Sequence, residues 1–253
     1  MTSIEMVNDV FTCRQDTDLA IVTFLKGAKK LATSVNAKET LLMVLKTIKD
    51  SREINGVALI YSDEYSGITE YRQFWQKILE EKQYYDGRSS TVPYKSAAMQ
   101  TLETIRTYPK PIVGGMVGDI APDSLGLNLA LDLRIACEGT TYFLPNLQLG
   151  FPPSGLLSFY LARSLGPHRA TEIMLTKQKI SAQEALDFGL ITQIVSPEDL
   201  ENTCFDKLRQ LSTIPDCTLV ESRRVLQPDL DEVNDFINAG IDGSLRCQIR
   251  LST

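Results

Sequence analysis

At 253 residues, the chain is long enough to form one large domain with its own hydrophobic core. Hydrophobic residues make up 43% of it and charged residues 23%, as is usual for a soluble globular protein. Its net charge of -6 argues against a nucleic-acid-binding protein, which needs an electropositive face. We therefore expect no nucleic-acid partner, although a few local cations could still bind a phosphorylated ligand.

Residues that form disulfides, metal sites and membrane anchors are sparse. The five cysteines are scattered and odd in number, which favours reduced thiols over a disulfide framework. The single histidine, His168, excludes a His-rich metal site, and no carboxylates stand at metal-ligand spacing. The first residues do not resemble a signal peptide, and no apolar run approaches the roughly 20 residues needed to span a bilayer. We expect a cytoplasmic protein with no metal and no membrane partner.

The first half of the chain alternates strand and helix patterns. Residues 18–24 and 56–61 are short, β-branched and bounded by polar residues, so they are predicted strands. Residues 37–50 lie between them and carry leucines and an isoleucine at helical spacing. Residues 83–94 are predicted to form a mobile loop before a helix at 97–106.

The next segments continue this alternation. Residues 111–117 and 133–137 are predicted strands, with a helix at 124–131 between them. Strand, helix and strand in succession imply right-handed crossovers and largely parallel pairing. The predicted fold class is therefore α/β.

After about residue 166 the pattern becomes helical. Ser181 and Glu184 stand at the spacing of a capping box, which marks the start of one helix. We predict an α/β core over residues 1–196 and a helical C-terminal region over residues 197–253. The helices predicted in this half span residues 169–175, 181–188, 197–212 and 229–250.

The most specific stretch runs from Lys110 to Pro197. It contains KPIVGGMVGDIAPDSLGLNLALDLRIACEG, then YFLPNLQLGFPPSGLL, then SLGPHRATEIMLTKQKISAQEALDFGLITQIVSP. Together these segments resemble, without a gap, the central part of the crotonase (enoyl-CoA hydratase/isomerase) family. The resemblance implies a crotonase-like spiral of β-β-α units with a helical C-terminal trimerisation region. It also implies a homotrimer or hexamer, an acyl-CoA thioester as ligand and no tightly bound cofactor.

The family binds the thioester oxygen with two backbone N–H groups, which stabilise the enolate as its charge develops. Matched residue by residue, the turn glycine of the family falls on Gly118, and the helix-side donor is the N–H of Asp123. The earlier donor falls near Gly67 and Ile68, because YSGITEY resembles a shortened form of the family's loop. The Asp123 side chain could act as a base or an orienting group, or it could be the N-cap of the following helix.

Both glutamates that hydratases of this family use are missing. Their positions fall on Gly126 and Asn146, and neither residue exchanges a proton at neutral pH. Hydration by the two-glutamate route is therefore not expected, whereas isomerisation, decarboxylation and thioester hydrolysis remain open. The alternative is a non-catalytic homologue that binds acyl-CoA or acts as a scaffold. A carrier-protein-bound acyl group could also replace free coenzyme A.

Other family positions complete the expected site. The nucleophilic aspartate of the dehalogenases falls on Pro153, which excludes their reaction. Ser154 and Tyr142 are candidates for contact with the acyl group, together with Gly67 and Ser124, although a turn role is favoured for Ser154 and an aromatic such as Tyr142 is more often a core residue. Asn146 could bond to substrate or occupy a turn. The basic residues that could meet phosphates, or simply form solvated faces, are Lys29, Lys30, Arg223 and Arg224.

Overall fold

The computed structural model describes residues 4–33, 35–62, 68–69, 71–73, 76, 88–150 and 155–251. In this part of the chain, seven strands form a large sheet in the order β1-β2-β3-β4-β5-β7-β10, and three form a small sheet in the order β6-β8-β9. The large sheet contains β1 (Glu5–Val7), β2 (Phe11–Asp16), β3 (Leu19–Phe24), β4 (Gly56–Tyr61), β5 (Ile112–Met116), β7 (Leu133–Cys137) and β10 (Gln193–Val195). The small sheet contains β6 (Asp119–Ile120), β8 (Thr141–Phe143) and β9 (Lys179–Ser181).

The large sheet is mainly parallel, as the sequence predicts. Strand β3 pairs in parallel with β4, β4 with β5, β5 with β7, and β7 with β10. Among the described strands of this sheet, antiparallel pairing is confined to the N-terminal strands, where β1 pairs with β2 and β2 with β3. The strands predicted at residues 56–61 and 133–137 are confirmed with the same bounds.

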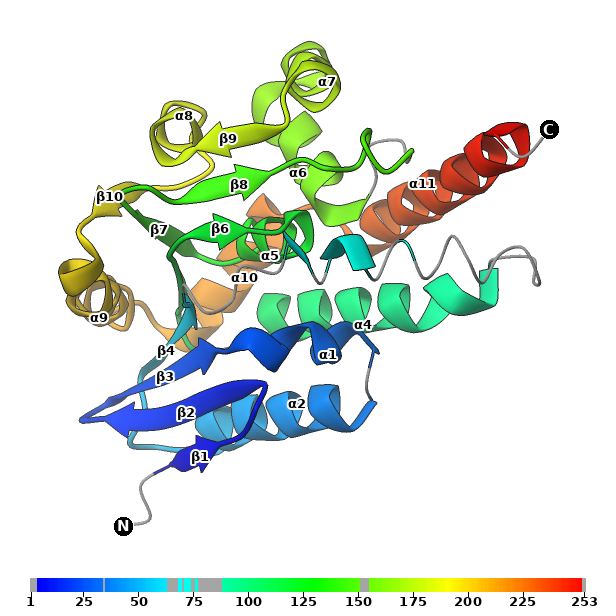
Figure 1. The fold of residues 1–253 in the computed structure, drawn as a ribbon. Coiled ribbons are helices and arrows are strands. Elements are labelled where there is room, and N and C mark those ends of the chain that lie inside the picture. The colour runs from blue at the N-terminus through cyan, green and yellow to red at the C-terminus, as the bar shows by residue number, and fades with distance from the viewer. Residues whose placement is uncertain are drawn as a thin grey trace.

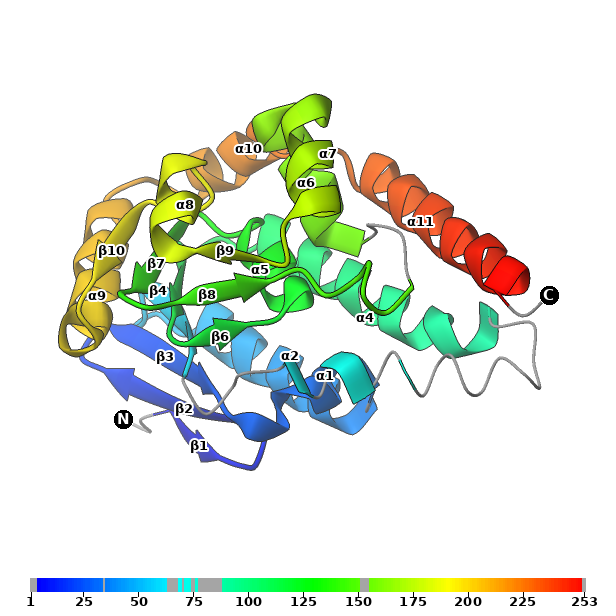
Figure 2. The same cartoon turned by 45° about the horizontal axis from the view of Figure 1, so that its top comes forward.

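Two consecutive β-β-α units build the centre of the fold. Strand β5 continues through Gly118 into β6 and then α5 (Pro122–Asn128), and β7 continues through Gly139 into β8 and then α6 (Gly155–Leu165). Both glycines have positive φ, +72° and +77°, which side chains disfavour, so each lets the chain turn from the large sheet into the small one. These repeated units confirm the predicted spiral, and Figure 2 shows β6, β8 and β9 as a separate layer.

Helices cover both faces of the large sheet (Figure 1). Alternate strand residues belong to different core clusters, because successive side chains point to opposite faces. Ala20 and Val22 belong to the larger cluster, which includes side chains of α2 (Val35–Asp50) and α4 (Arg88–Arg106). Leu19 and Ile21 belong to the other, which includes side chains of α9 (Leu200–Leu211). The remaining helices are η1 (Lys26–Lys29), α1 (Lys30–Thr33), α7 (Pro167–Thr176), α8 (Ala182–Asp187), η2 (Pro197–Asp199), α10 (Asp216–Leu226) and α11 (Leu230–Leu251).

Some predicted bounds need correction. Helix α4 begins at Arg88, so the prediction of a loop over residues 83–94 is wrong from residue 88 onward. Packing against α11 supports this extension, since Lys95 Nζ donates to Asn238 Oδ1. The predicted capping box is confirmed: Glu184 N–H donates to Ser181 Oγ at 3.2 Å, and Ser181 N–H donates to Glu184 Oε2 at 2.9 Å.

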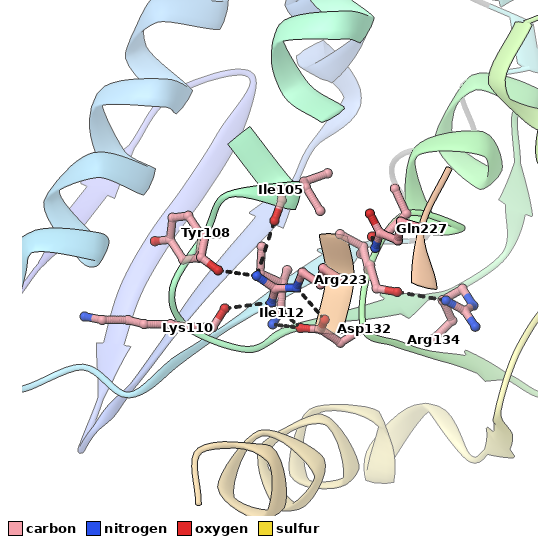
Figure 3. A network of polar contacts seen from close by, with 10 residues as sticks. Ile105, Tyr108, Lys110, Ile112, Asp132, Arg134, Arg223 and Gln227 are labelled. Atoms are coloured by element: carbon pink, nitrogen blue, oxygen red, sulfur yellow. Dashed lines mark hydrogen bonds and ion pairs between the residues drawn. The ribbon is translucent and has the colours of Figure 1, made fainter. Parts of the chain in front are cut away.

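A buried arginine ties the C-terminal helices to the sheet (Figure 3). Arg223 of α10 forms a bidentate ion pair with Asp132, with distances of 2.7 Å to Oδ1 and 2.5 Å to Oδ2. Its remaining N–H groups donate to the carbonyl oxygens of Ile105, Tyr108 and Lys110. Our prediction of a solvated face or a phosphate contact is therefore wrong for Arg223, which is 4% exposed because these partners surround it.

Of the other three basic residues considered as phosphate contacts, Arg224 and Lys30 lie at the surface, and the side chain of Lys29 lies outside what the structure describes. Arg224 is exposed and pairs with Glu221, and Lys30 is exposed and pairs with Asp9. Among the described helices, none is both long enough and apolar enough to cross a lipid bilayer.

Candidate functional site

An apolar cavity of about 130 Å³ lies between the large sheet and the helices α2, α4 and α5. Its walls come from β3 and β4, from these three helices, and from single leucine and isoleucine side chains of α6 and α11. The charged residues in its described wall are Lys38, Lys95 and Asp123. The cavity therefore reaches the start of α5, where the family resemblance predicts the thioester oxygen.

The start of α5 places backbone N–H groups beside this cavity. Ala121 is the N-cap residue and Pro122 is the first helical residue, so the interpretation of Asp123 as the N-cap is wrong. Proline is favoured at the first helical position because its φ suits a helix and it needs no partner for an N–H. The N–H groups of Ser124 and Leu125 both donate to the Ala121 carbonyl at 3.1 Å. Asp123 thus carries the first N–H of the helix, and both Asp123 and Ser124 line the cavity.

The second predicted donor segment lies next to the first. Ile68 is buried and packs in a small cluster with Tyr71 and with Ala121, the residue that precedes α5. The structure thus brings Ile68 and the start of α5 together, as a pair of oxyanion donors requires. Gly67 lies outside the described residues.

Position 126 has no room for a side chain. A Cβ atom built on Gly126 would lie 2.7 Å from the Leu157 nitrogen and 2.9 Å from the Leu156 Cβ. Real Cβ atoms essentially never approach so closely, so α6 would have to move to admit one. Leu156 also lines the cavity. A hydrophobic helix therefore fills the space beside Gly126, the position that the family resemblance matches to the first glutamate of the hydratases.

Asn146 is buried in a turn that follows Pro145. The hydroxyl of Tyr71 donates a hydrogen bond to Asn146 Oδ1 at 3.3 Å. Tyr71 was not among the residues predicted for the site, and no motif marks it, because its partner lies 75 residues away. Asn146, which the family resemblance matches to the second glutamate, is thus a neutral amide that a phenol orients.

One other predicted residue, Tyr142, is absent from the described cavity wall. Tyr142 is fully buried in β8, and burial raises the pKa of its phenol. Its hydroxyl has no hydrogen-bond partner among the described residues, and it is not part of the described wall. Ser154 and Pro153 lie outside the described residues.

The chain is similar in sequence to known proteins. The model of the enoyl-CoA hydratase/isomerase family matches residues 15–233 of the chain. A 4-chlorobenzoyl coenzyme A dehalogenase of an Arthrobacter species is 30% identical over 106 residues, 42% of this chain and 38% of the relative. A probable enoyl-CoA hydratase of Mycobacterium tuberculosis is 28% identical over 165 residues, 63% of this chain and 58% of the relative. These alignments thus span 38% and 58% of the lengths of the two relatives.

The fold has a close counterpart among solved structures. An enoyl-CoA hydratase of Bacillus halodurans superposes with a TM-score of 0.74 at 16% identity, covering 94% of this chain and 95% of that one. The likeness therefore extends over nearly the whole fold, while the sequences have diverged.

Proposed function

Because the chain belongs to the enoyl-CoA hydratase/isomerase family, we propose that it binds an acyl thioester of coenzyme A. In this proposal the thioester oxygen accepts hydrogen bonds from the N–H groups of Asp123 and Ile68. These donors stabilise the enolate beside a largely apolar cavity, where hydrogen bonds to a developing charge are stronger than in water. The acyl chain occupies the apolar cavity that Asp123 and Ser124 line.

The contact of Gly126 with α6 is the observation that carries this proposal. A glutamate cannot be placed at position 126 without moving Leu156 and Leu157, and Asn146 supplies no acid or base. Addition of water across a double bond requires both a proton acceptor and a proton donor. The site therefore supports chemistry that needs an oxyanion hole but not this pair of carboxylates.

Decarboxylation meets this condition better than isomerisation or thioester hydrolysis. Isomerisation needs a base to move a proton, and hydrolysis needs a group to activate water. In decarboxylation the bond to a carboxylate next to the α-carbon breaks and carbon dioxide leaves. The electron pair forms the enolate, and a solvent proton then completes the product. We therefore propose a thioester decarboxylase with Asp123 and Ile68 as oxyanion donors.

A second candidate is a protein that retains the thioester without converting it. The carboxylate of Asp123 lines the same cavity as the proposed oxyanion site, and its negative charge opposes an enolate. This arrangement favours binding of a neutral thioester over formation of a charged intermediate.

Calorimetry with acyl-CoA and malonyl-type CoA thioesters, followed by mass analysis of each mixture, separates these candidates. Loss of 44 mass units, the mass of carbon dioxide, from a malonyl-type thioester is the expected result. Binding without any product would replace the decarboxylase by the binding protein. If no coenzyme A thioester binds, the proposal that the substrate is a thioester of free coenzyme A fails. The same acyl groups attached to a carrier protein then test the remaining substrate class.

The family resemblance also leads us to propose a homotrimer or hexamer in the cytoplasm, with residues 197–253 contributing to trimerisation. Light scattering of the purified chain measures the mass of the assembly. A monomer at micromolar concentration would contradict this proposal.

A further inference from the structure

The acyl cavity carries two lysines in its otherwise largely apolar wall. Lys38 comes from α2 and Lys95 from α4, and both are partly buried. Lys95 Nζ donates to Asn238 Oδ1 of α11, whereas no hydrogen bond or ion pair joins Lys38 to the residues that the structure describes. A lysine lines an apolar wall with its stem and keeps its ammonium group at the rim, where the charge is available to an anion that reaches the end of the cavity.

Lys38 marks the side of the cavity that faces away from the candidate oxyanion site. Lys38, Leu42 and Thr104 also line a second hollow on the outer side of α2 and α4. Asp123 and Ser124 line the first cavity and are not part of the described wall of the second. A chain that starts at α5 and fills the cavity therefore meets Lys38 near its far end.

The charges inside the cavity favour an anion at that end. Lys38 and Lys95 are positive, and the single carboxylate in the described wall, Asp123, lies at the start of α5. Glu39 and Glu103 line the outer hollow with Lys38, but they are not in the described wall of the cavity. An anion that approaches from within the cavity thus meets the two cations before these carboxylates.

We propose that Lys38 and Lys95 form an anion subsite for a carboxylate at the far end of the acyl chain. This inference rests on the proposed function, because it takes the cavity as the acyl site. A cavity of about 150 Å³ holds benzene, so the present one has room for about five or six carbon atoms. The substrate class is then a thioester whose acyl chain carries a carboxylate at the end opposite the thioester, in addition to the carboxylate next to the α-carbon that decarboxylation removes.

Calorimetry with hexanoyl-CoA and adipoyl-CoA tests the subsite, because the two thioesters have equal chain length and differ only in the terminal group. We expect adipoyl-CoA to bind about ten- to hundredfold more tightly, as for a hydrogen bond to a charged partner. Lys38→Met keeps an unbranched side chain with a similar helix propensity, and it removes the positive charge. It is expected to abolish the preference while leaving the affinity for hexanoyl-CoA unchanged.

Lys46→Met is the matched control, since Lys46 lies on the same helix and is exposed outside the cavity wall. It should leave both affinities unchanged. Equal binding of the two thioesters by the unaltered protein would overturn the inference and leave the proposed function intact. A Lys38→Met variant that weakens both thioesters equally would assign Lys38 to the coenzyme phosphates and also overturn it. Failure of both thioesters to bind would overturn the proposed function itself.

Discussion

The hydroxyl of Tyr71 lies 3.3 Å from Asn146 Oδ1 and donates a hydrogen bond to it. Both side chains are buried, and Tyr71 lies three residues after Ile68, the second proposed oxyanion donor. Because the phenol bonds the amide oxygen, the amide nitrogen of Asn146 is the group that remains to donate toward a ligand. The pair thus couples the segment of the proposed donor Ile68 to Asn146, which the family resemblance matches to a glutamate of the hydratases.

Tyr71→Phe is expected to lower the free energy of unfolding by about 1 kcal/mol, because the buried oxygen of Asn146 loses its partner. It should also weaken acyl-CoA binding, since the amide is no longer held in one orientation. Tyr142→Phe is the matched control: the Tyr142 hydroxyl is buried with no described partner, so its removal should be neutral or stabilising. Urea denaturation and calorimetry measure both effects, and equal losses in the two variants would contradict the assigned bond.

Asp123→Asn keeps the backbone N–H that we propose as an oxyanion donor and removes the negative charge. We expect it to bind an enolate analogue such as a nitronate thioester about tenfold more tightly, because a like charge near the oxyanion is gone. Calorimetry with the nitronate and with a neutral thioester of equal length separates this charge effect from a general change in affinity, which would alter the dissociation constants of both ligands. Loss of all turnover in the variant would instead identify the Asp123 carboxylate as a base.

Gly126→Ala is expected to destabilise the fold by about 1–3 kcal/mol through overpacking. In an exposed helix the same change usually stabilises by about 1 kcal/mol, so the sign of the effect is informative. Thermal denaturation measures it, and a stabilised variant would show that α6 moves aside easily. For the same reason, the double variant Gly126→Glu with Asn146→Glu should not hydrate a short enoyl-CoA, which absorbance of the conjugated thioester can follow.

Arg223→Ala is expected to cost about 3–5 kcal/mol of stability, because it leaves Asp132 buried without its counter-ion. The neighbouring variant Arg224→Ala should cost less than about 1 kcal/mol, since the pair of Arg224 with Glu221 is exposed. Denaturant unfolding of the two variants provides the comparison. Similar losses would mean that the ion pair of Arg223 contributes no more than a surface contact.

Glu184→Ala tests the capping box through pH. The hydrogen bond from Lys177, followed by that from the Ser181 backbone, lowers the pKa of Glu184 from 4.5 to about 2. Its stabilising contribution is therefore complete above pH 4.5 and is lost as the pH falls towards 2. We expect a stability difference of about 0.5–1 kcal/mol at neutral pH, small because the pair is partly exposed. Urea denaturation across this pH range should show the gap closing, and a gap independent of pH would argue against the ionised carboxylate.

The parts of the fold that the sequence predicts well are those with a sustained pattern. Strand β4 (Gly56–Tyr61) is a buried apolar run, and helix α2 repeats its leucines at helical spacing. By contrast, β6 has two residues, too few to show any period. Asp123 resembles an N-cap by type, yet the N-cap is Ala121 and Pro122 is the first helical residue, so the helix starts two residues earlier.

Contacts between distant residues are the part that the sequence does not reveal. Arg223 is surrounded in sequence by polar neighbours and resembles a solvated residue, but Asp132 decides its burial. The lack of room for a side chain at Gly126 also depends on how closely α6 passes, and no local sequence pattern describes that path. Family resemblance predicts that the glutamate positions fall on Gly126 and Asn146, whereas only the structure shows that Leu156 and Leu157 leave no room for a side chain at Gly126.

The bond between Arg223 and Asp132 has a consequence for biosynthesis. Asp132 leaves the ribosome 91 residues before its partner. A buried carboxylate without a counter-ion is unfavourable, so the segment from Lys110 to Asp132, which contains α5, cannot settle into its final packing until α10 has been made. The middle of the chain therefore matures only when its last quarter has emerged, and a nascent protein interrupted before Arg223 should be a substrate for chaperones or proteases.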